Sequence, residues 1–294
     1  MVEALRAGPP PALAGHLPHM MGEEYEAAAP LHRRPNPDTQ AAMTNKLLGV
    51  LSAMPEEISH FADDSGGRTV LGGLSYLHGH IAGREAIFVE TGMGKVNAAM
   101  AAALMLDRFG CGALMFCGVA GGLDPALGVG DVVIATRNIQ HDYGAEQEAG
   151  FKTYQPGAPP LPEFDDTHGY DLPASLIERL RAAVWGLLLE PLDAAVGVGV
   201  RTPSIHFGPV VTGDVFINSD RTRRRLHDTY GALATEMEGG AVAQVAERFG
   251  GVPFVNVRCL SDLASSDSHI DFAAFLPAAT RYASLVAHRL APLI

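Results

Sequence analysis

The stretch Ala234-Thr235-Glu236-Met237-Glu238-Gly239-Gly240-Ala241 decides how we interpret the fold. It follows an apolar run from Gly231 that predicts a short buried strand, and it precedes a helix. The apolar face of that helix recurs at helical spacing at Val242, Val245, Ala246 and Phe249. Open α/β sheets bind ligands at the carboxyl ends of their strands, so Glu236 and Glu238 are candidate ligand-binding residues. Alternatively, the two acids only complement the dipole at the start of the helix.

The composition favours a protein that binds small molecules or other proteins. The chain has 294 residues, a formal charge of −12 and a pI near 5.4, which argues against nucleic acid or an anionic membrane as partner. Cys111, Cys117 and Cys259 form no Cys-x-x-Cys pair, as expected in a reducing compartment. No apolar run reaches the roughly 18 residues of a membrane helix. Prolines and charges interrupt the N-terminal region, so we expect no secretory signal and a cytoplasmic location.

The order of elements predicts an α/β fold. Short apolar runs at 47–51, 113–117, 131–136 and 252–258 read as buried strands, and helical patterns lie between them and at about 271–290. Such alternation implies a mixed, mainly parallel sheet covered by helices on both faces.

Several segments allow a more local prediction. Residues 1–44 are rich in Pro, Ala, Gly and His, so we expect a disordered or loosely attached extension before a single domain over 45–294. Residues 68–77 and 81–90 predict a strand pair with its turn near Gly79. Residues 144–170 contain four prolines and predict a long loop, which in compact domains is usually functional or disordered.

Two short motifs suggest chemistry that the spacing does not support. The Gly92-Met93-Gly94-Lys95 stretch opens a helix but lacks the long glycine loop of a nucleoside-triphosphate site, and Val96 stands where that motif needs Ser or Thr. The His141-Asp142 pair is compatible with zinc or acid–base work, yet no third ligand follows at a recognisable spacing. A structural hydrogen-bonded pair is the favoured interpretation.

Six stretches together resemble the 5′-methylthioadenosine/S-adenosylhomocysteine nucleosidases of the nucleoside phosphorylase superfamily. They are Ala53-Met-Pro-Glu-Glu57, Gly92-Met-Gly-Lys-Val-Asn97, Gly118-Val-Ala-Gly-Gly-Leu123, Gly213-Asp-Val-Phe-Ile217, Glu236-Met-Glu-Gly-Gly-Ala241 and Arg258-Cys-Leu-Ser-Asp262. The resemblance covers roughly residues 46–290, and the insert around 140–206 is most similar to actinobacterial members. It implies a three-layer α/β/α fold, a homodimer, no metal or other cofactor, and hydrolysis of the adenine N-glycosidic bond of a nucleoside substrate.

The resemblance also implies roles for individual residues. Asp262 would be the general acid that protonates the leaving adenine, which requires a carboxyl pKa raised by burial. Glu57 would orient and deprotonate the attacking water, with Arg258 beside it. Glu238 would bind the ribose hydroxyls and support the cationic sugar of the transition state.

The remaining implied residues shape the substrate pocket. Met237 would pack against the ribose and Phe216 would stack on the adenine, and the other predicted substrate-binding residues are Met93, Val119, Ser261 and Phe272. Val119 departs from the family, because many members have serine there, and a polar contact near the water or ribose is lost. A loop near 144–163 of the partner subunit would close the pocket for the 5′ substituent.

Three alternatives stay open at this point. A phosphorylase would use phosphate in place of water, but a carboxylate such as Glu57 about 4 Å from phosphate would cost several kcal/mol. A nucleosidase for aminodeoxyfutalosine, in menaquinone synthesis, would differ only in its 5′ pocket. A non-catalytic binding protein would be expected to lack one of the acids Glu57, Glu238 and Asp262, and all are present.

Overall fold

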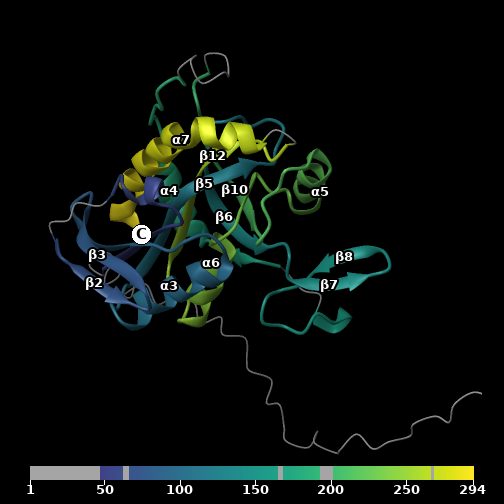
Figure 1. The fold of residues 1–294 in the computed structure, drawn as a ribbon, viewed down its shortest axis with the longest axis horizontal. Helices are drawn as coiled ribbons and strands as arrows, with labels where there is room; N and C mark the ends of the chain where they lie inside the picture. The colour runs from purple at the N-terminus through teal and green to yellow at the C-terminus, as the bar shows by residue number, and fades with distance from the viewer. Residues whose placement is uncertain (1–46, 62–65, 165–167, 193–200, 266–267) are drawn as a thin grey trace, which may run out of the picture. The chain divides into compact units, whose positions relative to one another are not determined.

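The computed structural model describes residues 47–61, 66–164, 168–192, 201–265 and 268–294. The expected extension over residues 1–44 lies outside the described residues. Within them a ten-stranded mixed sheet is flanked by helices on both faces, as the sequence predicts (Figure 1). Helices α7 and α4 lie on one side of the sheet, and α3 and α6 lie on the other.

The elements follow one another in the alternating order that the sequence predicts. The strands are β1 (Leu48–Ser52), β2 (Arg68–Leu71), β3 (Leu74–Ile81), β4 (Arg84–Glu90), β5 (Ala113–Gly122), β6 (Val132–Gln140), β7 (Gly144–Gln147), β8 (Gly150–Thr153), β9 (Tyr170–Asp171), β10 (Ile205–Thr212), β11 (Ala234–Glu236) and β12 (Phe254–Asp262). The helices are α2 (Pro55–Ile58), α3 (Lys95–Asp107), α4 (Ala174–Val184), α5 (Asp220–Tyr230), α6 (Gly239–Arg248) and α7 (Ser268–Leu290), with 3-10 turns η2 (Pro162–Phe164) and η4 (Ala291–Leu293).

The sheet closes on itself around its central strands. Its order is β11-β10-β6-β12-β5-β1-β4-β3-β2, and β11 also pairs with β5. The pairings of β5 with β1 and β12, and of β10 with β6 and β11, are parallel. The pairings of β12 with β6 and of β11 with β5 are antiparallel, so the sheet contains two parallel parts that run in opposite directions. The carboxyl ends of β1, β5 and β12 lie at one edge of their parallel part, which is where a sheet of this type binds ligands.

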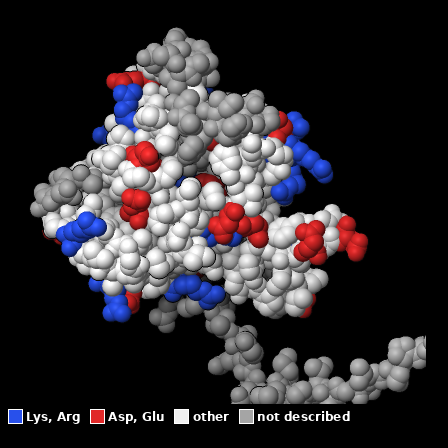
Figure 2. Space-filling view, viewed as in Figure 1, with Lys and Arg blue, Asp and Glu red and all other residues white. Residues whose placement is uncertain are grey.

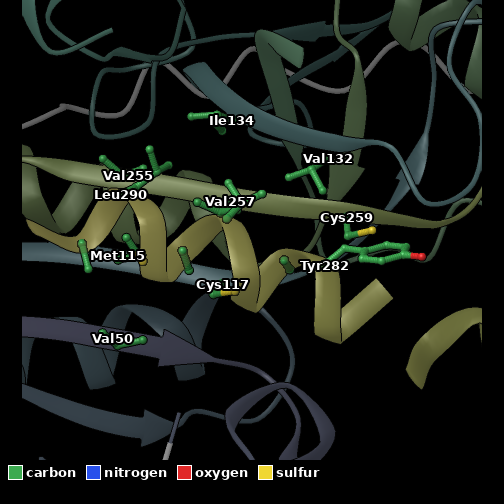
Figure 3. Packing of buried hydrophobic residues seen from close by; sticks show 14 of the residues in the cluster. Val50, Met115, Cys117, Val132, Ile134, Val255, Val257, Cys259, Tyr282 and Leu290 are labelled. Carbon is green, nitrogen blue, oxygen red and sulfur yellow. The ribbon is translucent and has the colours of Figure 1, made fainter. Parts of the chain in front are cut away.

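Two apolar layers hold the helices on the sheet. On one face Val50, Met115, Cys117, Val255 and Val257 pack against α7, as Figure 3 shows. On the other face residues such as Leu51, Leu114 and Phe116 pack against α3 and α6. Successive strand residues point to opposite faces, so strands that are apolar throughout supply both layers.

Two local predictions are wrong. Residues 68–90 form three strands, because the turns fall at Gly72–Gly73 and Ala82–Gly83, and Gly79 lies inside β3. The two glycines at 72 and 73 have positive φ angles, which a tight hairpin turn needs. The segment 144–170, which was predicted to be a long loop, contains the β7–β8 hairpin, η2 and the first residue of β9. Its four prolines lie between β8 and η2 or at the start of η2.

Within the described ranges, none of the helices is both long and apolar enough to span a membrane. On the face that Figure 2 shows, Lys and Arg (blue) and Asp and Glu (red) lie in small groups on a described surface that is mostly uncharged.

Candidate active site

A cavity of about 380 Å³ opens at the carboxyl ends of the central strands. Its volume is in the range of pockets for small ligands. The lining residues lie in the carboxyl-terminal parts of β5, β11 and β12 or in the segments that follow β1, β4, β10 and β11. They are Ala53, Met54, Glu57, Met93, Val119, Ala120, Gly121, Val215, Phe216, Ile217, Thr235, Glu236, Met237, Glu238, Arg258, Ser261 and Asp262. The structure therefore brings together nine of the ten predicted site residues. The tenth, Phe272, lies on α7, and its side chain is outside the described residues.

Glu57 is fixed by the short helix that begins after β1. Pro55 starts α2, and Glu57 is its third residue, so the carboxylate folds back onto the backbone at the start of the helix. Its Oε2 accepts hydrogen bonds from the N–H groups of Ala53 at 2.7 Å and Met54 at 3.0 Å. Oε1 accepts from the Val119 N–H at 3.0 Å. Burial raises the pKa of Glu57, although Arg258 and these N–H groups oppose the rise.

Arg258 is a buried cation at the centre of the site. It lies on β12, is 1% exposed, and its guanidinium carbon is 4.2 Å from the centre of the Phe116 ring. Its Nη2 forms an ion pair with Glu236, and its Nη1 lies 3.3 Å from Glu238 Oε2. Nη1 also donates to the carbonyl of Val119 at 3.2 Å.

Glu236 and Glu238 both reach Arg258, although they do not lie on the same strand. Strand β11 ends at Glu236, and the chain then turns so that Glu238 precedes helix α6. Glu236 accepts bonds from the N–H groups of Glu238 at 3.0 Å and Gly239 at 2.7 Å. Glu238 instead accepts from the Gly94 N–H at 2.9 Å, at the start of α3.

The two neighbouring acids therefore differ in their electrostatics. Glu236 has the ion pair with Arg258 and two backbone N–H donors. Glu238 has one N–H donor and a longer contact with Arg258. Burial raises the pKa of Glu238 to about 7, and the negative charge of Glu236 adds a smaller effect in the same direction. The positive charge of Arg258 opposes this rise.

Asp262 ends strand β12 after an irregularity in the ladder. Leu260 pairs with Ala120 and Asp262 with Gly121, so Ser261 is an extra residue. A bulge of this kind redirects the following side chain, and it turns Asp262 into the cavity. Oδ1 of Asp262 accepts the Ala264 N–H at 2.8 Å, and Oδ2 accepts the Ser261 hydroxyl at 3.1 Å.

The apolar residues define the mouth of the cavity. Phe216 and Met93 line it from the segments after β10 and β4, and both are exposed at its edge. Met237 lies in the chain between Glu236, which ends β11, and Glu238, which precedes α6. Val119 contributes its backbone to the site, because its N–H donates to Glu57 and its carbonyl accepts from Arg258.

Sequence reasoning named Glu236 as a candidate ligand-binding residue from its position after a strand, but the family resemblance gave it no role. It also missed Thr235, Val215, Ile217 and Met54, all of which line the cavity. Val215 and Ile217 flank Phe216, and Met54 and Thr235 lie in the quoted stretches around Glu57 and Glu238, so these stretches contained the signal.

His141 and Asp142 do not form the hydrogen-bonded pair that the sequence favoured. Asp142 pairs with Lys95 at 2.6 Å and accepts the Asp214 N–H at 2.9 Å, so its hydrogen bonds go to other segments than His141. His141 is buried, and burial lowers its pKa. In the described part of the chain, no cluster of three His, Cys, Asp or Glu residues could hold a metal ion.

Comparison with known proteins places this fold and cavity in a class. The profile of the Phosphorylase superfamily matches residues 47–292. The chain therefore belongs to this superfamily.

Individual relatives narrow the assignment. The chain is 39% identical over 249 residues to the 5′-methylthioadenosine/S-adenosylhomocysteine nucleosidase of Mycobacterium tuberculosis, which covers 84% of this chain and 97% of the relative. The nucleosidase of S. pneumoniae, solved with the transition-state inhibitor MT-ImmA, has a TM-score of 0.68 and 29% identity over 84% of this chain and 99% of its own. Futalosine hydrolase of Helicobacter pylori has the same TM-score at 26% identity, over 84% of this chain and 97% of its own. The protein is a member of the 5′-methylthioadenosine/S-adenosylhomocysteine nucleosidase family, as its motifs indicate.

Proposed function

We propose that this protein hydrolyses the N-glycosidic bond of 5′-methylthioadenosine and S-adenosylhomocysteine, releasing adenine and the 5-thio-ribose product. The observation that carries the proposal is the meeting of Glu57, Glu238 and Asp262 in one cavity around Arg258. The activity of the M. tuberculosis relative supports the choice of substrates.

The proposed reaction uses each acid at a different atom. Breaking the C1′–N9 bond leaves positive charge on the ribose and negative charge on the purine. Asp262 gives a proton to N7, so that adenine leaves as a neutral base. Glu57 takes a proton from water, whose oxygen bonds to C1′. Glu238 accepts hydrogen bonds from the ribose hydroxyls and stabilises the cationic sugar.

The rest of the cavity fits the rest of the substrate. Phe216 offers an aromatic face for the adenine, and Met237 offers an apolar contact for the ribose. Ser261 orients Asp262 through its hydroxyl. Met93 and Phe272 are assigned to the walls near the sugar and the 5′ substituent.

Phosphorolysis is disfavoured by the charges of the site. Among the described residues that line the cavity, Arg258 is the basic one, and its charge is engaged by Glu236 and Glu238. Glu57 adds a further buried carboxyl group. A phosphate ion at C1′ would therefore meet net negative charge, whereas a water molecule would not be repelled.

Futalosine-type nucleosides are the second candidate substrates, because futalosine hydrolase of Helicobacter pylori shares the fold along nearly its whole chain. The two candidates differ in the 5′ substituent, which in our proposal faces a loop near 144–163 of a partner subunit. A homodimer is part of this proposal. Exposed apolar side chains support it, at Met93 and Val215, which line the cavity, and at Val96, which lies at the start of α3.

The cellular setting is also a proposal. The superfamily match over 47–292 supports one nucleosidase domain over residues 45–294. The cysteines Cys111, Cys117 and Cys259 are free and buried, which fits a reducing compartment such as the cytoplasm. With these substrates the enzyme would serve methionine salvage and the removal of a methyl-transfer product.

The test is adenine release from methylthioadenosine, S-adenosylhomocysteine and aminodeoxyfutalosine, each with and without phosphate. We expect release from the two thio-nucleosides at a rate that phosphate does not change. Asp262→Asn and Glu57→Gln should each lower kcat by about 100-fold or more, as loss of a general acid or base does. Release from aminodeoxyfutalosine alone, or ribose 1-phosphate as a product, would refute the proposal.

A further inference from the structure

Arg258 is held from behind by two asparagines that the proposed mechanism does not use. The Nε–H of Arg258 donates to Asn256 Oδ1 at 2.7 Å. The Nδ2–H of Asn256 donates to Asn138 Oδ1 at 2.9 Å. All three residues are at most 3% exposed, so the chain of bonds is shielded from water.

The fold explains why the asparagines meet Arg258. Asn256 and Arg258 are two residues apart on β12, so their side chains point to the same face of the strand. Asn138 lies on the neighbouring strand β6. A Cβ at Gly239 would lie 2.1 Å from Asn256 Nδ2, so the glycine leaves the space that the amide occupies.

Along β12 the buried polar residues Asn256 and Arg258 alternate with the apolar residues Val255, Val257 and Cys259, which point to the other face of the strand. A buried amide N–H group without an acceptor is destabilising, and Asn138 supplies the acceptor for Asn256. The bond also fixes which way the amide points, since Asn256 must present its oxygen to Arg258 and its nitrogen to Asn138.

We propose that Asn256 and Asn138 are positioning residues for the reaction, which hold the guanidinium of Arg258 in the orientation that serves the acids of the site. A guanidinium is planar, so a bond at Nε together with the Phe116 ring at 4.2 Å fixes both its direction and its plane. Nη1 and Nη2 then face Val119, Glu238 and Glu236. This inference rests on the proposed function.

The orientation matters because Arg258 acts on two carboxyl groups at once. Burial raises the pKa of Glu57 and of Glu238, and the positive charge of Arg258 is the largest effect opposing that rise. If the guanidinium turns away, both carboxyl groups hold a proton up to a higher pH. Water activation by Glu57 then fails at a pH where the native enzyme works.

The experiment compares two substitutions of similar size at one position. Asn256→Leu removes the acceptor for Arg258, whereas Asn256→Asp retains an acceptor oxygen. We expect Asn256→Leu to lower kcat at pH 7 by about tenfold or more and to move the acid limb of the pH–rate profile up by about one pH unit. KM should change less than about threefold. Asn256→Asp should recover most of kcat.

Asn138→Leu provides a second variant, one bond further from Arg258, and it carries the test if Asn256→Leu does not fold. It should move the acid limb in the same direction by a smaller amount, because Asn256 loses the partner that orients it. Thermal unfolding of each variant separates a folded enzyme with an altered profile from a damaged fold.

The outcomes separate this inference from the proposed function. If the native enzyme releases no adenine, the proposed function fails. If the native enzyme is active and folded Asn256→Leu keeps its kcat and acid limb, the positioning role is wrong. Equal impairment in Asn256→Asp and Asn256→Leu, with an unmoved pH profile, would also overturn it.

Discussion

Replacing Glu238 by glutamine should make the protein more stable at neutral pH while removing its activity. The free carboxyl group has a pKa of 4.5, and burial raises the pKa of Glu238 to about 7 in the folded protein. Between these two values the folded state holds a proton that the unfolded state has released. Stability therefore falls as the pH rises from about 4.5 to 7.

The magnitude follows from the same two values. A tenfold change in proton affinity corresponds to about 1.4 kcal/mol, so ionising Glu238 costs the fold about 3 kcal/mol above pH 7. Glu238→Gln removes that cost, and its amide oxygen can still accept the Gly94 N–H. For a protein of this size we expect a Tm increase of roughly 5–10 °C at pH 8 and almost none at pH 4.5.

Glu236→Gln is the matched control, because Glu236 faces the same arginine. Its carboxylate forms the ion pair with Arg258 and accepts two backbone N–H groups. Removing one partner of a buried ion pair destabilises by about 3–5 kcal/mol, so this variant should lose stability at pH 8. The assay is thermal unfolding from pH 4.5 to 8.5 at one protein concentration, since association also shifts Tm. A Glu238→Gln effect that does not depend on pH, or a loss of stability at pH 8, would refute the reasoning.

Two further predictions concern parts of the structure outside the cavity. Burial alone would raise the pKa of Asp131, but hydrogen bonds from His206, Arg201 and the backbone lower it to about 2, below the ordinary value of 3.8. Asp131→Asn should therefore cost about 2 kcal/mol of unfolding free energy at pH 7, and the deficit should shrink as the pH falls from about 4 to 2, where the native carboxylate is protonated. Val96 is 80% exposed at the start of α3, on the surface that we assign to the dimer, so Val96→Glu should shift sedimentation from dimer to monomer and reduce adenine release. Val70→Glu, at a position that is 65% exposed on β2, should leave the mass unchanged, and an unchanged mass for both variants would contradict the proposed interface.

The sequence predicts those parts of the site that depend on local order. Glu57 and Asp262 each follow a buried apolar run, and the carboxyl ends of strands in such a sheet face a common side. The strand–turn–helix pattern around Glu236 and Glu238 is likewise local. Hence the fold class and the candidate acids could be inferred before any contact was known.

The remainder depends on contacts between distant segments. The pairing of β11 with β5, the bulge at Ser261 and the bond from Asn256 to Asn138 join residues that no local pattern relates. The turn near Gly79 was misplaced because the strand pattern continues through it, while the two glycines at 72 and 73 gave the stronger turn signal. The different partners of Glu236 and Glu238 also required the folded geometry.

The charges of the buried cluster explain both how the site stabilises the transition state and why it uses water in place of phosphate. Glu57, Glu236 and Glu238 share one guanidinium, and Glu236 makes the direct ion pair with it. The other two carboxyl groups are buried with raised pKa values, so their negative charge is incompletely compensated. A ribose that becomes positive in the transition state supplies the missing charge, and its stabilisation exceeds that of the neutral substrate. The same unbalanced charge repels a phosphate ion. One electrostatic property of the buried cluster thus favours the cationic transition state and disfavours phosphorolysis.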